Sequence, residues 1–362
     1  METVFIAALQ LIKGIGTAKI QALIAYFGSG KCVWQASLAD LEASKCIDRS
    51  LCYQFVEQRR LLDVDSLAEV WTNKDIKICC QSDELYPEML RQIFNPPLVL
   101  FYRGELTKND DKRLAIVGAR QATAYGKTIA KRLAEELTSA GVEVVSGAAR
   151  GIDTAAHEGA LVKGRTIAVL GCGIDVVYPK ENKRLLEEIA QNGVIISEYP
   201  PGTTAHPAYF PARNRIISGI SRGVVVVEAS LKSGSLITAE MALNEGRDVF
   251  AVPGSIFSEL SAGCHRLLQE GAKLVASSQD LFAEYEWHRS LLANSVTVLT
   301  AEELAVYKVL NSVLPLSIDE IIIKTKNDVS QIAVVLLQLQ LRGLVKESSS
   351  RCYVRMVKED VL

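Results

Sequence analysis

The residues of this chain that are best suited to bind an anionic ligand lie in one stretch without carboxylates. Between Glu198 and Glu228 there is no aspartate or glutamate, and residues 209–215 read YFPARNR, with guanidinium groups at Arg213 and Arg215. Guanidinium groups bind phosphate as a planar fork, and aromatic rings stack on nucleobases. The stretch therefore predicts a surface for single-stranded nucleic acid or for a nucleotide. An amphipathic helix whose arginines face water is the alternative.

The overall composition limits any nucleic-acid binding to a local patch. The 362 residues are 49% hydrophobic and 23% charged, and the net charge is −2. These values are typical of a globular protein with two or three domains and no general basicity. The eight cysteines contain no C-x-x-C pair, which argues against a zinc site or a disulfide framework. With no stretch approaching a membrane span, we expect a soluble cytoplasmic protein.

The middle of the chain, residues 113–288, alternates short apolar runs with helical patterns. The apolar runs are 114–117, 142–145, 166–170, 194–196, 224–227, 249–252 and 274–275, and helical stretches such as 125–140, 180–191 and 235–245 separate them. Runs that are apolar throughout, rather than alternating, indicate strands buried on both faces. We therefore predict an α/β domain with a mostly parallel sheet.

Two segments precede this predicted domain. Residues 1–75 show helical spacing, and a Gly-x-Gly turn at Gly14 and Gly16 separates two helices at 4–12 and 20–27. This pattern predicts either a helix-hairpin-helix (SAM-like) domain, whose turn amides hold a backbone phosphate, or a plain helical hairpin. Residues 76–112 are rich in turns around one strand-like run and are predicted to be a connector that packs on the core.

The last segment, 297–362, predicts a winged-helix-like domain. It has three helical stretches, 301–310, 318–324 and 330–342, followed by two short runs that suggest a hairpin wing. A winged helix usually reads DNA with its third helix. Here the exposed positions of that helix are glutamines, with only Arg342 basic. A module that binds a partner or supports a dimer is at least as consistent with the sequence.

Basic, glycine and hydroxyl residues follow the predicted strands at their carboxyl ends, where open α/β sheets bind ligands. Glycine turns and helix N-termini there present backbone amides to phosphate, although a tight turn with a solvated arginine is the plainer interpretation. No carboxylate pair or metal-ligand cluster accompanies them, so we predict binding without catalytic residues, metal or cofactor. The residues are Gly118, Arg120, Ser146, Gly147, Arg150, Lys180, Asn182, Ser233, Gly234 and Ser235.

One possible acid–base pair lies within this set of turns. Asp153 is placed to cap a helix, and His157 follows one turn later. Facing each other on the helix, they could act as a general acid and a general base. A structural hydrogen bond is the favoured interpretation.

Taken in order, the motifs resemble the DNA-processing protein A family (DprA, also called Smf). The resemblance implies an extended Rossmann-like domain that binds single-stranded DNA, forms homodimers and helps to load a RecA-type recombinase in natural transformation. The matching motifs are GAR at 118–120, SG at 146–147, RGID at 150–153, YP at 178–179, SEYPPG at 197–202, FPARNRIIS at 210–218, SGSLITA at 233–239 and FAVPG at 250–254.

The resemblance also assigns roles to particular residues. The arginine of the Gly-x-Arg motif, here Arg120, belongs to the basic pocket of the family. Arg213 and Lys180 are further phosphate contacts by the same resemblance, with Phe210 as a stacking ring. Asn214 and Arg215 complete the predicted DNA-binding set. His265 departs from the family, which often has asparagine at this position.

Two other functions fit part of the same pattern. Phosphoribohydrolases on a related fold need a Gly-Gly-x-Gly-Thr-x-x-Glu loop. The corresponding stretch here, residues 233–240, lacks the glycine before Thr238 and the spacing of the glutamate. A nucleotide-sensing or scaffolding module is the third possibility, because it would use the same phosphate cradle.

Overall fold

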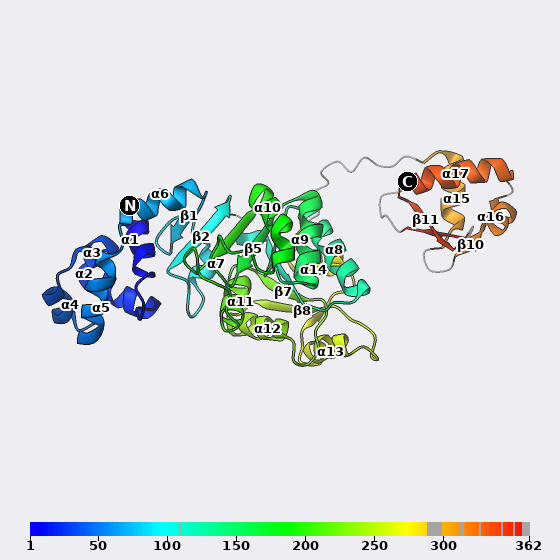
Figure 1. Ribbon diagram of the computed structural model, residues 1–362. Helices are drawn as coiled ribbons and strands as arrows, with labels where there is room; N and C mark the ends of the chain where they lie inside the picture. Colours follow the sequence, from blue (N-terminus) through cyan, green and yellow to red (C-terminus); the bar gives the residue numbers. More distant parts are fainter. Residues whose placement is uncertain are drawn as a thin grey trace. The chain divides into compact units, whose positions relative to one another are not determined.

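The computed structural model describes residues 1–108, 110–287, 299–311, 315–325, 327–341, 343–349 and 352–356. The chain forms two compact units, residues 1–288 and 289–362 (Figure 1). The predicted domain boundaries at 288 and 297, and Arg342, lie outside the described residues.

A nine-stranded sheet forms the centre of the first unit in the described part of the chain. Its order is β1-β2-β6-β5-β4-β3-β7-β8-β9, and the strands from β3 to β9 are parallel. The mostly parallel sheet predicted from the apolar runs is therefore confirmed. The parallel strands are β3 (Arg113–Val117), β4 (Glu143–Ser146), β5 (Thr166–Leu170), β6 (Val194–Ser197), β7 (Gly223–Val226), β8 (Asp248–Ala251) and β9 (Lys273–Leu274).

The segment predicted to be a connector differs from that expectation, because it supplies two strands of this sheet. β2 (Val99–Gly104) pairs with β6 in antiparallel orientation, and β1 (Lys77–Cys80) pairs with β2. Residues 99–102 of β2 are buried, as expected of a strand covered on both faces. The flanking turns make this strand recognisable in the sequence, but they do not indicate which strand it pairs with.

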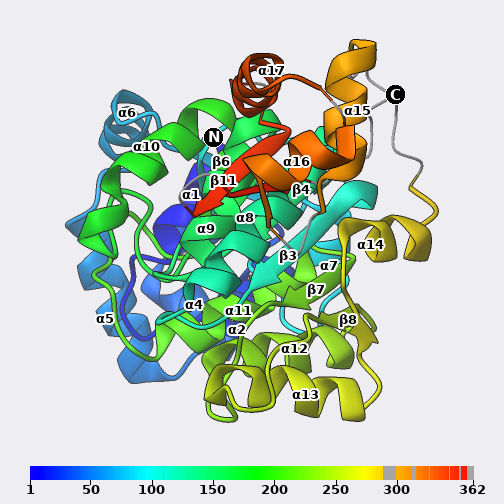
Figure 2. The same ribbon diagram turned by 90° about the vertical axis from the view of Figure 1, so that its right-hand side faces the viewer.

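Helices cover both faces of the sheet (Figure 2). Side chains of β3 alternate between them: Leu114 and Ile116 face one cluster, whereas Ala115 and Val117 face the other. This arrangement is the predicted Rossmann-like fold. The first face carries α8 (Ala124–Ser139), α9 (Ile152–Lys163), α10 (Lys183–Asn192) and α14 (Ser278–Glu284), and the second carries α7 (Glu88–Arg91), α11 (Tyr209–Gly219), α12 (Gly234–Asn244) and α13 (Ala262–Gln269).

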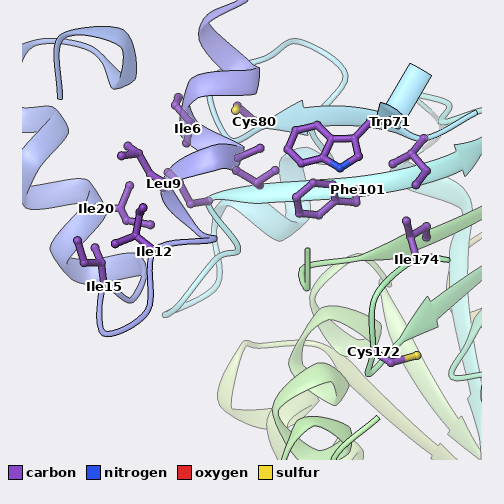
Figure 3. Close-up of a cluster of buried hydrophobic side chains, with 14 of the residues drawn as sticks. Ile6, Leu9, Ile12, Ile15, Ile20, Trp71, Cys80, Phe101, Cys172 and Ile174 are labelled. Atoms are coloured by element: carbon purple, nitrogen blue, oxygen red, sulfur yellow. The ribbon is translucent and has the colours of Figure 1, made fainter. Parts of the chain in front are cut away.

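The predicted helical N-terminus is confirmed, and it packs against the antiparallel edge of the sheet. Figure 3 shows Trp71 against Phe101 of β2, with ring centroids 5.6 Å apart, in a cluster that extends to Ile6 and Leu9 of the first helix. Gly14 has φ +89° in the turn between the first two helices, a value that favours glycine. The helices are α1 (Glu2–Leu9), α2 (Thr17–Phe27), α3 (Gly30–Gln35), α4 (Leu38–Ser44), α5 (Arg49–Arg60) and α6 (Val64–Asn73).

The second unit has the winged-helix architecture that the sequence predicts. Three helices pack around buried apolar residues such as Val306, Ile332 and Leu339, and the small sheet has the order β10-β12-β11. The elements are α15 (Ala301–Val309), β10 (Leu316–Ser317), α16 (Ile318–Thr325), α17 (Val329–Leu341), β11 (Val345–Ser349) and β12 (Cys352–Arg355).

The strand order creates a topological switch point in the large sheet. From β3 the chain adds β4, β5 and β6 on one side, then returns through α11 and places β7 on the other side of β3. The connections after β3 and β7 therefore leave in opposite directions. A crevice opens at the carboxyl ends of such strands, which is where open α/β sheets bind ligands.

Candidate functional site

Two adjoining cavities lie at this switch point. We call the larger one, of about 530 Å³, the groove, and the smaller one, of about 170 Å³, the inner pocket. They share one set of lining residues, so they form a continuous site. The shared residues are Arg120, Gln121, Ala149, Tyr178, Phe210 and Arg213.

Most of the predicted binding residues, although distant in sequence, line this site. They come from the turns after β3, β4 and β7 and from the first turns of α11 and α12. The lining members are Gly118, Arg120, Gly147, Arg150, Phe210, Arg213, Asn214, Ser233, Gly234 and Ser235. Ser146, Lys180, Asn182 and Arg215 do not line either cavity.

The turn after β3 is braced against β7. The amide of Ala119 donates to the carbonyl of Glu228 at 2.7 Å, and the buried Glu228 carboxylate accepts from the amide of Thr123 at 2.9 Å. Thr123 in turn caps α8 by accepting from the amide of Gly126. These bonds hold the backbone of the turn in place. The position of Arg120, whose side chain lines the groove, is therefore fixed.

Arg120 supplies an exposed positive charge. Its guanidinium carbon lies 5.4 Å from the centroid of the Phe210 ring. Within the described ranges of the chain, this guanidinium makes no hydrogen bond or ion pair. Phe210 also contacts Tyr178, with centroids 5.1 Å apart. A cation and two rings are thus presented together at the mouth of the inner pocket.

Arg213 has a different environment from the one predicted. Its side chain is buried, and Nη1 donates to the carbonyl of Gly147 at 2.7 Å and also to the carbonyl of Val169. A Cβ on Gly147 would lie 2.6 Å from Nη2, so a larger residue here would require the buried guanidinium to shift. Burial lowers the pKa of Arg213 to about 10, so the group stays charged at neutral pH. Arg213 therefore orders the floor of the site and contributes charge from beneath it.

Asp153 and His157 do not form a pair. The Asp153 carboxylate accepts from the amides of Gly147 at 3.2 Å and Ala149 at 3.3 Å. His157 Nδ1 bonds to Thr166 Oγ1 at 2.7 Å. The predicted helix cap is also wrong, because α9 begins at Ile152 and Asp153 lies in its first turn. Each side chain orders a different loop or strand, which agrees with the structural interpretation.

Burial controls the charge of both of these groups. It raises the pKa of Asp153, while the nearby Arg213 acts in the opposite sense. It lowers the pKa of His157 to about 3, so this imidazole is neutral at any ordinary pH. A neutral histidine without contact to a carboxylate is poorly placed for acid–base catalysis.

Several residues that were predicted to contact DNA phosphates are instead bonded to other groups of the protein. Arg150 pairs with Glu181, and the partly buried Arg215 pairs with Glu198 at 2.5 Å. Lys180 is exposed beside the inner pocket, next to Pro179, which lines it. The two remaining side chains bond to neighbouring strands and loops: Ser146 Oγ donates to Ile116 O, and Asn182 Nδ2 donates to Ala148 O and Thr154 Oγ1.

The N-terminus of α12 provides the far wall of the groove. Ser233 caps this helix, and its hydroxyl lies 2.8 Å from that of Ser235. A Cβ on Gly234 would meet no atom within 4 Å, so the backbone there is open to an approaching ligand. The amides of Ser235 and Leu236 already bond to Ser233, so the attraction for an anion at this position comes from the helix dipole and the open backbone at Gly234.

Some lining residues were not in the predicted set. Gln121, Pro207, Ile237, Thr238 and Leu260 line the groove. Tyr178 was noted only as part of a motif, and its ring contact with Phe210 joins segments 32 residues apart. These residues have no chemical signature of their own; only the fold brings them together. His265, the departure from the family pattern, bonds to Gly254 O at 3.1 Å.

The described residues contain no group of His, Cys, Asp or Glu arranged to hold a metal ion. None of the helices in those ranges has the length and apolar character of a membrane span. All eight cysteines are free thiols.

The fold places the chain in the class of Rossmann-like α/β proteins with a groove at the switch point and a winged-helix unit. Family models agree: the one for DNA recombination-mediator protein A matches residues 77–286, and the one for the DprA winged helix domain matches residues 293–349. The chain belongs to the DprA/Smf family.

Individual relatives cover the chain to different extents. Protein Smf from Synechocystis sp. is 33% identical, with 98% of this chain and 99% of that protein covered. The X-ray structure of DNA processing protein A from Streptococcus pneumoniae matches with a TM-score of 0.68 and 41% identity, over 79% of this chain and 99% of that one. A structure of DNA processing protein A from Helicobacter pylori, which concerns its single-stranded DNA binding mode, has a TM-score of 0.53 and 34% identity over 59% and 97%.

Proposed function

We propose that this chain binds single-stranded DNA in the groove, protects incoming DNA and helps to load a RecA-type recombinase during natural transformation. The observation that carries the proposal is the exposed guanidinium of Arg120, free of ion pairs among the described residues, over the ring of Phe210. Such a pair offers charge to a phosphate and a flat surface to a base.

The charges around the site favour an anion. Arg150 is neutralised by Glu181, and Arg213 lies near Asp153. Arg120 forms no ion pair among the described residues, and Asp153 acts on it less than on Arg213. The start of α12 lines the same groove. The positive potential of the site therefore depends mainly on Arg120.

The aromatic rings favour a single strand over a duplex. Phe210 and Tyr178 line the inner pocket, and a base can enter it only when it is not paired and stacked in a helix. Recognition by stacking is also tolerant of sequence, since every base has a π-face. This tolerance suits a protein that handles DNA of any sequence.

The binding function is favoured over the enzymatic alternative by the state of the acidic group at the site. Among the described residues that line the two cavities, Asp153 alone carries a carboxylate. This carboxylate already accepts hydrogen bonds from two backbone amides. A phosphoribohydrolase needs a carboxylate free to assist cleavage. Incubation with nucleoside monophosphates should therefore release no base, and steady release would favour the enzyme.

The finer parts of the proposal, a homodimer and a RecA-type partner, rest on the family. Membership is supported by the two family models and by the full-length relative. Co-sedimentation of the chain with a recombinase on single-stranded DNA tests the partner, and light scattering tests the dimer. A strictly monomeric protein that leaves recombinase loading unchanged would contradict both parts.

Equilibrium binding to three ligands tests the central function. The chain should bind a single-stranded oligonucleotide more tightly than a duplex of the same sequence, and a mononucleotide much more weakly than either. Its affinity for the strand should fall linearly on a log–log plot against salt, because bound phosphates release counterions. Tighter binding of a mononucleotide than of the strand would favour the nucleotide-sensing alternative.

The ring of Phe210 has its own expected effect. Phe210→Ala should weaken single-strand binding by roughly 1–3 kcal/mol if the ring stacks on a base. Competition between the strand and a base-free polyanion separates stacking from charge. An equal loss for both ligands would show that the ring does not stack.

A further inference from the structure

One exposed aromatic residue lies beyond the groove, on the loop that follows β8. We define the rim turn as residues 253–258. Within it Phe257 is 93% exposed and Ile256 is 81% exposed, although both are large and apolar. Water contact with such side chains is unfavourable, so adjacent exposed residues of this kind commonly mark an interaction surface.

The rim turn is held in place rather than hanging free. Tyr125 Oη donates to the carbonyl of Pro253 at 3.0 Å, and His265 Nε2 donates to the carbonyl of Gly254 at 3.1 Å. Within the turn, the amide of Phe257 donates to Ser255 Oγ at 3.3 Å. A braced turn presents its ring at a low cost in conformational entropy, which favours binding.

The rim turn is continuous with the groove. Leu260, three residues after Phe257, lines the groove, and its carbonyl accepts from the amide of Ala229 at 2.7 Å. Tyr125 lies in the first turn of α8, which follows the Arg120 turn. The rim turn is thus bonded directly to α8, and the segment that follows it is bonded to the loop after β7.

We propose that Phe257 is a second stacking position, on which the strand places a base after it leaves the groove. This inference rests on the proposed function. Exposed cations lie on the adjoining segments, at Lys232 after β7 and Lys127 in α8, so a polyanion can follow this surface. Glu259, beside the turn, is also exposed and would repel a phosphate. The rim therefore offers a ring to a base, not a charge to the backbone.

A length series measures this directly. Thymidine oligonucleotides of about 4 and about 16 nucleotides span the range of single-strand site sizes. Phe257→Ala should leave binding of the short strand unchanged and weaken the long strand roughly 5- to 100-fold, as loss of one stacked base does. The salt slope of the long strand should stay the same, because no phosphate contact is lost.

Matched variants control for apolar surface and for folding. Phe94 is 96% exposed and is bonded through its amide to Glu245, beyond the C-terminus of α12, whereas the groove is at its N-terminus. Phe94→Ala should bind both strands as the unchanged chain does. Phe257→Trp should retain long-strand affinity, and Phe257→Leu should lose it, because only the first keeps a π-face.

The outcomes separate this inference from the function on which it rests. Failure of the unchanged chain to bind either strand would overturn the proposed function. Normal long-strand binding by Phe257→Ala would overturn the second stacking position alone. If that variant instead altered the oligomeric mass or the capture of a protein, Phe257 would belong to a protein interface.

Discussion

The parallel sheet buries an arginine at each end of its strands, but the two ends compensate the charge differently. At the amino end, Arg113 is fully buried and pairs with the buried Glu143 at 2.9 Å. At the carboxyl end, Arg213 is also buried, but it donates to the backbone carbonyls of Gly147 and Val169 and to Asn214 Oδ1 rather than to a carboxylate. The first arrangement neutralises charge within the protein.

The second arrangement keeps positive potential available at the surface. Carbonyl dipoles orient the guanidinium of Arg213, and the nearby Asp153 offsets part of its charge without an ion pair among the described residues. The exposed Arg120 lies in the same groove. A ligand phosphate can then complete the compensation. In the proposed function, the same residue type therefore serves stability at one end of the sheet and binding at the other.

The largest expected effect belongs to the amino end. Arg113→Ala should lower the free energy of unfolding by about 3 kcal/mol, because the buried Glu143 would keep only the more distant Arg165 as a counter-charge among the described residues, beside the neutral Thr107 hydroxyl. Urea denaturation followed by tryptophan fluorescence reports this, since all three tryptophans lie within residues 1–288. Single-strand affinity of the folded variant should not change. A loss of affinity would break the comparison.

At the carboxyl end we expect a somewhat smaller effect on stability, together with a loss of DNA affinity. Arg213→Met should cost about 2 kcal/mol of unfolding free energy, because it leaves buried carbonyls without donors. The same variant should also bind the strand more weakly and with a flatter salt slope. Salt titrations of single-strand binding by Arg113→Ala and Arg213→Met, measured side by side, test this difference. If Arg213→Met kept full affinity, the charge beneath the groove would have no role in binding.

The pH dependence of stability sharpens the account of the buried neutral histidine. The pKa of His157 is about 3 in the folded chain, against an ordinary value of about 6.5, so only the unfolded chain takes up its proton between these values. This pKa difference leaves the folded chain at its full stability above pH 6.5, and the folded chain loses stability as the pH falls toward 3. The loss between pH 7 and pH 5 amounts to about 2 kcal/mol.

His157→Gln removes this titration. Denaturation at pH 7 and at pH 5 should show a smaller acid loss for the variant than for the unchanged chain, and other titrating groups cancel in the difference. Equal losses would mean that His157 takes up a proton in the folded state.

Much of the fold could be predicted, because its signals are local. Runs that are apolar throughout mark the parallel strands, and the turn residues after them mark the binding edge. The strand β2 was recognisable as a strand-like run, but its pairing with β6 joins residues about ninety positions apart. No local pattern records such a partner, so the segment was predicted to be a connector.

The sequence predicted that most of these residues would lie at one edge of the sheet, but not which partners their side chains would have. Arg213 and Arg215 are two positions apart, yet one binds carbonyls and the other pairs with Glu198. A guanidinium has the same signature in sequence whether it meets a phosphate, a carbonyl or a carboxylate. Arg150 likewise finds Glu181, thirty-one residues away, only through the fold.

The exposed arginine of the groove gives the most direct test of the account. Arg120→Ala should leave stability unchanged within about 0.5 kcal/mol, as expected for an exposed side chain. In a salt titration it should weaken single-strand binding and reduce the log–log slope by about 1, the share of one phosphate contact. An unchanged affinity and slope in a stably folded Arg120→Ala variant would contradict the central claim that the groove binds the strand.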